Sequence, residues 1–165
     1  MQEDRMMRTF LRTVTVGTIL AALGISHLTA QAVDPLVGTW ELNITKSTYN
    51  PGPAPRSETR TYVVAGQEIK ATSKGVAADG TPTSGQWTVN YDGKDRPITG
   101  TPEADALSLK RIDAFTGEFT QKKAGKVVAT GTRVISKDGK VMTITTDGTN
   151  AKGQAVHDVE VFDKR

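Results

Sequence analysis

From residue 35 onward, hydrophobic and polar residues alternate along the chain in short runs that end at turn-forming pairs. Period-two alternation is typical of β-strands with one buried face, and no window repeats its apolar residues at the spacing of a helix. Asp-Gly pairs, which favour tight hairpin turns, stand at 79–80, 92–93, 138–139 and 147–148. We therefore predict an all-β domain in which about ten antiparallel strands follow one another in hairpins.

The alternating runs place the strands at defined positions. They predict strands over 38–44, 58–64, 68–74, 85–91, 96–98, 106–112, 118–122, 127–136, 141–146 and 156–163. Residues 46–56 are left outside the strands, because three prolines at alternate positions favour an extended, polyproline-like crossing.

The faces of these strands indicate how the sheet closes. Trp40, Leu42 and Ile44 share one face of the first strand, and Trp87, Val89 and Tyr91 share one face of the fourth. A long meander with one apolar face either exposes two edges or closes on itself, and closure removes the edges. We expect an up-and-down barrel or a strongly curled half-barrel. An outer-membrane barrel is disfavoured, because both strand faces are rich in Thr, Lys and Asp.

The first thirty or so residues have the pattern of a secretory signal peptide. Basic residues are followed by the apolar run 14–25, a polar stretch and the small-x-small sequence Ala30-Gln31-Ala32. The run is too short to span a bilayer. We predict a signal peptide over 1–32, cleaved after Ala32, and a periplasmic or secreted domain over 33–165; translation could start at Met1, Met6 or Met7.

Composition narrows the classes of function. The net charge is only +3, which disfavours a nucleic-acid binder with its clustered basic residues. The chain has no cysteine, so thiolate chemistry, thiolate metal sites and disulfides are excluded. No metal site, cofactor or further membrane span is expected, and we expect a monomer.

Two ends of the predicted domain resemble a known superfamily. Leu36-Val37-Gly38-Thr39-Trp40-Glu41-Leu42-Asn43 resembles the opening Gly-x-Trp strand of the calycins, the lipocalins and fatty-acid-binding proteins, although avidin-like barrels open in the same way. Residues 159–164 are similar to the closing strand of fatty-acid-binding proteins. The resemblance implies a calycin-like barrel and a small hydrophobic ligand.

The whole of 33–165 also resembles a group of exported bacterial proteins to which no activity is assigned. The shared segments are Trp40-x-Leu42-Asn43-x-x-Lys46-Ser47, Pro51-Gly52-Pro53, Tyr91-Asp92-Gly93-Lys94, Leu109-Lys110-Arg111-Ile112-Asp113, Ser136-Lys137-Asp138-Gly139-Lys140 and Gly148-Thr149-Asn150.

One departure from the fatty-acid-binding pattern concerns the ligand site. The closing strand of that family carries an Arg-x-Tyr pair that holds the ligand carboxylate, and the matching positions here are Glu160 and Phe162. A carboxylate would repel an anion, so a fatty acid held at these two positions is disfavoured. The helical lid of the family is also replaced, by the proline segment 46–56.

Candidate site residues come from the large and charged side chains. By the resemblance, Trp40 closes one end of the barrel and packs against a late-strand arginine, for which Arg133 is suited. Aromatic residues that could line a ligand pocket are Tyr62, Trp87, Tyr91 and Phe162, although they could equally fill a solid core. Arg60 and Arg111 could point inward as counter-ions of an acidic ligand, or could lie on a solvated face.

The sequence has few side chains suited to acid–base catalysis. Outside the predicted signal peptide the one histidine is His157, and its neighbour Asp158 points to the opposite face of a strand. We therefore predict no catalytic residue and a protein that is not an enzyme. The favoured function is the binding of a small hydrophobic molecule; the alternative is a structural or protein-interaction module with a solid core, whose partner surface would be segment 46–56.

Overall fold

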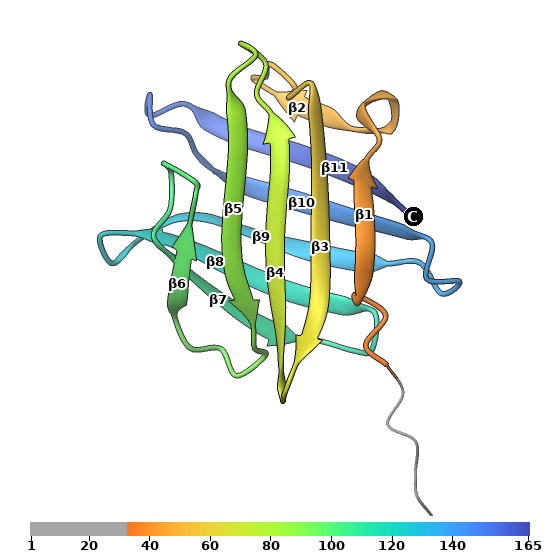
Figure 1. Cartoon of the computed structure of the whole chain (residues 1–165). Coiled ribbons are helices and arrows are strands. Elements are labelled where there is room, and N and C mark those ends of the chain that lie inside the picture. The colour runs from red at the N-terminus through yellow and green to blue at the C-terminus, as the bar shows by residue number, and fades with distance from the viewer. Residues whose placement is uncertain (1–32) are drawn as a thin grey trace, which may run out of the picture. The chain divides into compact units, whose positions relative to one another are not determined.

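The computed structural model describes residues 33–165 (Figure 1), so the signal peptide predicted over 1–32 lies outside the described residues. Strands occupy most of this part of the chain, with one 3₁₀ turn, η1 (Ile44–Lys46). The strands are β1 (Gly38–Leu42), β2 (Thr48–Asn50), β3 (Ser57–Ala65), β4 (Glu68–Val76), β5 (Pro82–Val89), β6 (Arg96–Thr99), β7 (Ala106–Arg111), β8 (Thr116–Lys123), β9 (Lys126–Ile135), β10 (Val141–Thr149) and β11 (Ala155–Lys164).

Ten of the strands close into an antiparallel barrel. β1 pairs with β3, each strand from β3 to β11 pairs with the next along the chain, and β11 pairs back with β1. Figure 1 shows β1 and β3–β5 crossing in front of β7–β11. The predicted meander and its closure are confirmed. Between 33 and 165, no helix has the length and apolar character needed to cross a membrane.

The first departure from the predicted strands is at Ile44. Strand β1 ends at Leu42, and Asn43 caps η1 by accepting a hydrogen bond from the Lys46 N–H at 3.2 Å. Ile44 is therefore partly exposed instead of sharing the buried face of Trp40 and Leu42. The turn leads into β2, which pairs with the first half of β11. The prediction that no strand lies in 46–56 is wrong at Thr48–Asn50.

A second departure concerns Asp147-Gly148, which lies inside β10 and is not a turn. A Cβ at Gly148 would stand 2.5 Å from the Val128 carbonyl oxygen, so glycine here permits close approach of β9. The turn comes later, at Asn150, whose Oδ1 accepts hydrogen bonds from the Lys152 and Gln154 N–H groups, both at 3.0 Å.

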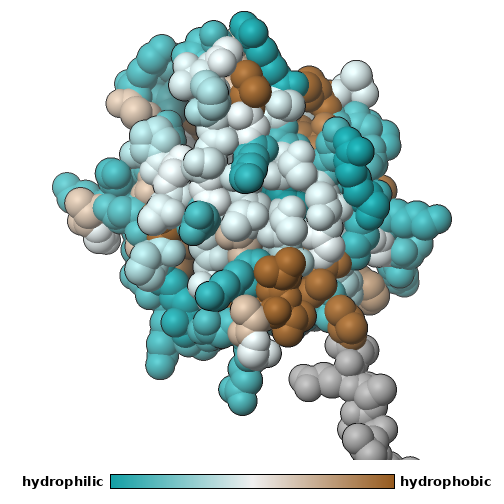
Figure 2. Space-filling view, in the orientation of Figure 1, coloured by the Kyte–Doolittle hydropathy of each residue, from teal (hydrophilic) through white to brown (hydrophobic). Residues whose placement is uncertain are grey.

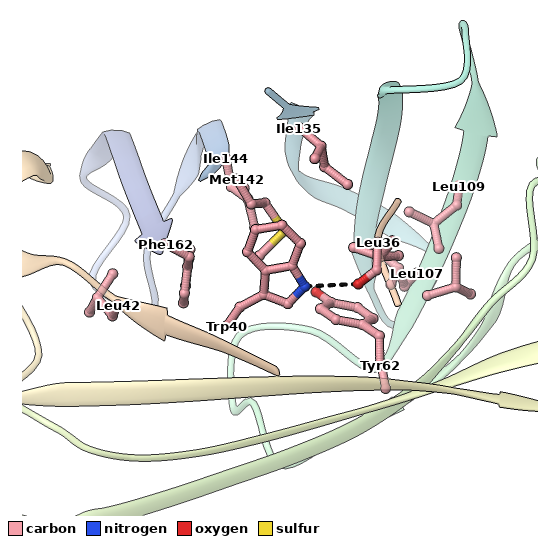
Figure 3. Packing of buried hydrophobic residues seen from close by; sticks show 12 residues of the cluster. Leu36, Trp40, Leu42, Tyr62, Leu107, Leu109, Ile135, Met142, Ile144 and Phe162 are labelled. Carbon is pink, nitrogen blue, oxygen red and sulfur yellow. Dashed lines mark hydrogen bonds between the residues drawn. The ribbon is translucent and has the colours of Figure 1, made fainter. Parts of the chain in front are cut away.

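The packed core lies around Trp40 (Figure 3). The indole Nε1 of Trp40 donates a 2.8 Å hydrogen bond to the Leu36 carbonyl, so the one polar atom of this buried ring is satisfied. Tyr62, Met142 and Phe162 are fully buried in the same cluster. Trp40 therefore belongs to the core that fills one end of the barrel interior.

The outer face of β3–β5 carries mainly small polar residues. Figure 2 shows this face in near-neutral and hydrophilic colours over most of its area, with apolar atoms gathered at its lower end. Strand β3 ends there with Val63 and Val64, which are 51% and 61% exposed. Alternation along β3 thus separates a polar outer face from an inner face made by Glu58, Arg60 and Tyr62.

Candidate ligand-binding cavity

The interior beyond the packed core is hollow. Inward side chains of β3–β11 line a cavity of about 320 Å³. This volume is at the lower end of the range found for small-molecule sites. Its buried wall is mainly apolar and includes Tyr62, Leu107, Leu109 and Ile144, together with the buried Arg133. Tyr62 and Trp87 meet edge to face, with ring centroids 5.9 Å apart, and both rings line the cavity.

The mouth of the cavity lies where its lining residues are exposed. These residues lie at the start of β5, at the end of β6 and in the loop that follows β6: Thr83, Ser84, Thr99, Gly100, Pro102 and Glu103. Gly100 has φ +84°, and a Cβ there would stand 1.7 Å from the Ser84 carbonyl oxygen. Glycine is therefore required at this position for the loop to pack against β5.

A cluster of charged side chains lies near the mouth, between β3 and β11. The Arg60 Nε donates to Glu58 Oε1 at 2.7 Å, and Arg60 Nη2 donates to Glu160 Oε2 at 3.0 Å. From β2, the Tyr49 hydroxyl approaches the other oxygen of Glu160, at 3.4 Å. Arg60 also stacks on Phe162, 4.6 Å from the ring centroid. One guanidinium thus serves two carboxylates.

Burial and charge shift the titration of this cluster. Burial raises the pKa of Glu160, which the Glu58 carboxylate raises further and Arg60 lowers in part. Burial lowers the pKa of Arg60, but the carboxylates of Glu58 and Glu160 outweigh it and leave that pKa well above its ordinary value. Arg60 therefore stays charged, while Glu160 takes up a proton more readily than an exposed glutamate.

Arg133 lines the same cavity on a different wall. Its side chain is only 7% exposed, and its Nη2 donates a 2.6 Å hydrogen bond to the Tyr91 hydroxyl. Its Nε is buried and has no hydrogen-bond partner. Within 33–165, no acidic side chain forms an ion pair with this guanidinium, in contrast to Arg60.

The predicted role of Arg133 at Trp40 needs correction. The cation over the Trp40 ring is Lys164, whose Nζ lies 4.9 Å from the ring centroid and also donates to the Pro35 carbonyl at 3.1 Å. Lys164 is the partner of Trp40 in the closing β1–β11 register, whereas Arg133 faces Gly117 and Ile144 on neighbouring strands. The closing strand itself therefore supplies the cation.

Of the predicted ligand-binding residues, the structure brings Tyr62 and Trp87 to the cavity. Phe162 does not line it, because it is buried beneath Arg60 and opposite Leu42. Tyr91 follows the end of β5 and contacts Arg133 instead. Arg111 lies at the surface, where it pairs with Asp34 and stacks 3.9 Å from the Tyr91 ring centroid.

Some lining residues were not identified from the sequence. Glu58 shares the inward face of β3 with Arg60 and Tyr62, and Phe119 and Gln121 share that of β8. Because alternate residues of a strand point to the same face, placing Tyr62 inside the barrel would have placed these lining residues inside as well.

His157 also has a partner that the sequence did not reveal. Its Nδ1 lies 2.7 Å from Asp147 Oδ1, its cross-strand neighbour on β10. Both side chains are more than half exposed, and neither lines the cavity. An exposed pair of this kind contributes little to stability.

The closed ten-stranded meander with a hollow interior is an up-and-down β-barrel. No protein family and no curated protein sequence matches the chain. Among solved structures, the chain is similar to Rv2717c from M. tuberculosis, at 16% identity over 79% of this chain and 93% of that one, with a TM-score of 0.51. This likeness supports the fold alone.

Two further structures resemble the chain at lower TM-scores. Zebrafish ileal bile acid-binding protein, complexed with cholic acid, matches at 16% identity over 79% of this chain and 99% of its own, with a TM-score of 0.47. The redesigned β-barrel mFAP1, bound to DFHBI, matches at 14% identity over 79% and 95%, with a TM-score of 0.44.

Proposed function

We propose that this protein binds a small, mostly apolar molecule inside its barrel. The observation that carries the proposal is the cavity of about 320 Å³, bounded by aromatic and aliphatic side chains and open at a polar mouth. Sites for small molecules have this composition, an apolar lining with a few fixed polar groups. A core that only stabilised the fold would be packed without such a void.

A fluorescence titration with the neutral apolar dye N-phenyl-1-naphthylamine tests the proposal. Gln121 and Thr120 are consecutive on β8, and only Gln121 lines the cavity. Gln121→Trp fills the cavity and is expected to weaken dye binding at least tenfold, whereas Thr120→Trp adds the same ring outside and leaves the affinity unchanged. A wild-type protein that binds no dye, or equal binding by both variants, contradicts the proposal.

We further propose that the domain acts outside the cytoplasm, in the periplasm or as a secreted monomer. The basic start, short apolar run and Ala30-Gln31-Ala32 sequence support this location. Expressed as the full chain in a bacterium, the exported protein is expected to begin at Val33 by mass spectrometry. An Ala30→Glu, Ala32→Glu variant should accumulate uncleaved. Recovery of cytoplasmic wild-type protein with an intact N-terminus would contradict the proposal.

An alternative function is protein interaction through segment 46–56. It is supported by the outer edge of β2, which pairs with no second strand among the described residues. A partner captured by the full chain should then be lost from a Pro51→Ala, Pro53→Ala variant and retained by Gln121→Trp. The opposite pattern assigns the partner to another surface.

A further inference from the structure

The two arginines inside the barrel differ in their counter-charges. Arg60 is held between Glu58 and Glu160, at 2.7 Å and 3.0 Å. Between residues 33 and 165, Arg133 has only the neutral Tyr91 as a side-chain partner, through a hydrogen bond to its hydroxyl and a ring centroid 5.7 Å from the guanidinium carbon. Its Nε is unpaired although the residue is only 7% exposed. A buried charge without a counter-ion and a buried donor without an acceptor are each costly. Arg133 is therefore an incomplete site within the protein itself.

The carboxylates near the mouth do not complete this site. Arg133 and Glu160 are both register partners of Ile144, on opposite sides of β10. Their backbones are thus two strand spacings apart, roughly 10 Å. Both carboxylates of the cluster are engaged by Arg60, and the buried Ile144 on β10 lies between Arg133 and Glu160 in the sheet.

The charges that line the cavity consequently differ between its mouth and its buried wall. Near the mouth are Glu58, Glu160 and Glu103, with Arg60 as the single cation among them. The buried wall holds Arg133 beside apolar side chains, where electrostatic attraction is weakened little by solvent. An anionic group is repelled at the mouth and attracted at Arg133.

We propose that the ligand carries one anionic group on an apolar body, and that Arg133 binds this group within the cavity. The proposal rests on the proposed function, since it assigns the chemistry of the same ligand. The apolar body lies against Leu107, Leu109 and the Tyr62 ring, and the anionic group pairs with the guanidinium of Arg133, which lines the same cavity. Carboxylate, sulfonate and phosphate groups share this acceptor chemistry.

Two dyes that differ by one anionic group test the proposal. 1-Anilinonaphthalene-8-sulfonate has the ring system of N-phenyl-1-naphthylamine plus a sulfonate. Wild-type protein is expected to bind the sulfonated dye at least tenfold more tightly, which is the scale of a charge-assisted hydrogen bond. Arg133→Met should remove this preference, so that the variant binds the two dyes with equal affinity.

Arg111→Met is the matched control. Arg111 also contacts Tyr91, but it lies at the surface and pairs with Asp34, so its removal should leave the preference intact. Arg133→Lys keeps a buried cation without the planar guanidinium, and it should show an intermediate preference. A cooperative thermal transition confirms that each variant is folded, since partly folded states also bind the sulfonated dye.

The outcomes separate the two proposals. If neither dye binds, the proposed function fails. If the neutral dye binds and the wild type shows no preference for the sulfonate, or Arg133→Met keeps the preference, the anionic ligand is overturned while cavity binding stands. The comparison of the two dyes on wild-type protein tests the anionic ligand even if Arg133→Met does not fold.

Discussion

Arg60 and Glu160 lie on strands that are separated by β1, yet their side chains meet at 3.0 Å inside the barrel. On β3, Arg60 is the register partner of Trp40 in β1, whereas Glu160 precedes Phe162, the β11 residue that pairs with Leu42 at the end of β1. The Arg60 side chain therefore reaches past the end of β1 to a carboxylate that lies beyond the last β1–β11 backbone pair.

Removal of this guanidinium is expected to destabilise the barrel. Arg60→Met leaves Glu58 and Glu160 largely buried without a cation, which should lower the free energy of unfolding by roughly 3 kcal/mol. Glu160→Gln keeps the Arg60–Glu58 pair and should cost less. Urea denaturation measures both, and a loss below about 1 kcal/mol for Arg60→Met would show that the cluster is dispensable.

Glu160 should also make stability depend on pH. Because burial raises its pKa above the ordinary 4.5, the folded state holds the proton more tightly than the unfolded state. The contribution of Glu160 is therefore most favourable below pH 4.5 and is lost as pH rises through the folded pKa.

The measurement compares wild type with Glu160→Gln across this range. The stability of Glu160→Gln relative to wild type should increase as pH rises above 4.5, by up to about 1.4 kcal/mol per pH unit within the window. Glu118→Gln, at an exposed position of β8, controls for loss of a carboxylate. A constant difference at every pH would mean that Glu160 titrates alike in both states.

Trp40 is predicted to be a stability residue. Trp40→Ala removes a fully buried ring and its hydrogen bond to Leu36, and should lower the free energy of unfolding by about 3–5 kcal/mol. Lys164→Met removes the cation over the ring and should cost at most about 1–2 kcal/mol. Thermal and urea unfolding test both, and a larger effect for Lys164→Met than for Trp40→Ala would reverse this assignment.

The mouth of the cavity is expected to be sensitive at Gly100. Gly100→Ala combines a positive φ with a backbone clash at Ser84, so it should both destabilise the fold and alter dye affinity. Gly93→Ala has a similar φ, +72°, but no atom within 4 Å of the added carbon. It should cost only about 1–2 kcal/mol of conformational strain, with binding unchanged. Equal effects of the two substitutions would show that the loop tolerates the added carbon.

The strands were predictable because their signals are local. Alternation and Asp-Gly turns depend on neighbouring residues, and they located all ten barrel strands. Asp147-Gly148 was wrongly predicted as a turn, because glycine favours turns and also permits the close contact between β10 and β9 that is found here. Strand β2 was missed because it is stabilised by pairing with β11, more than a hundred residues away. This pairing forms despite the prolines that follow β2, and no local pattern indicates it.

The site was less predictable than the fold, for a physical reason. The sequence indicates which side of a strand faces inward, but not how much volume the inward side chains leave unfilled. The partnership of Arg60 with Glu160, and the isolation of Arg133, arise from the register around the closed barrel. The resemblance to calycins predicted Arg133 as the partner of Trp40, and no local sequence feature indicated that Lys164 takes this position.

The pairing of Trp40 with Lys164 has a consequence for biosynthesis. The first strand of the barrel meets the last, so Trp40 cannot be enclosed until the ribosome has made β11. Contacts between such distant residues form slowly, because a long loop must be closed first. A nascent chain that lacks β11 therefore leaves the barrel open and the Trp40 ring without its cation.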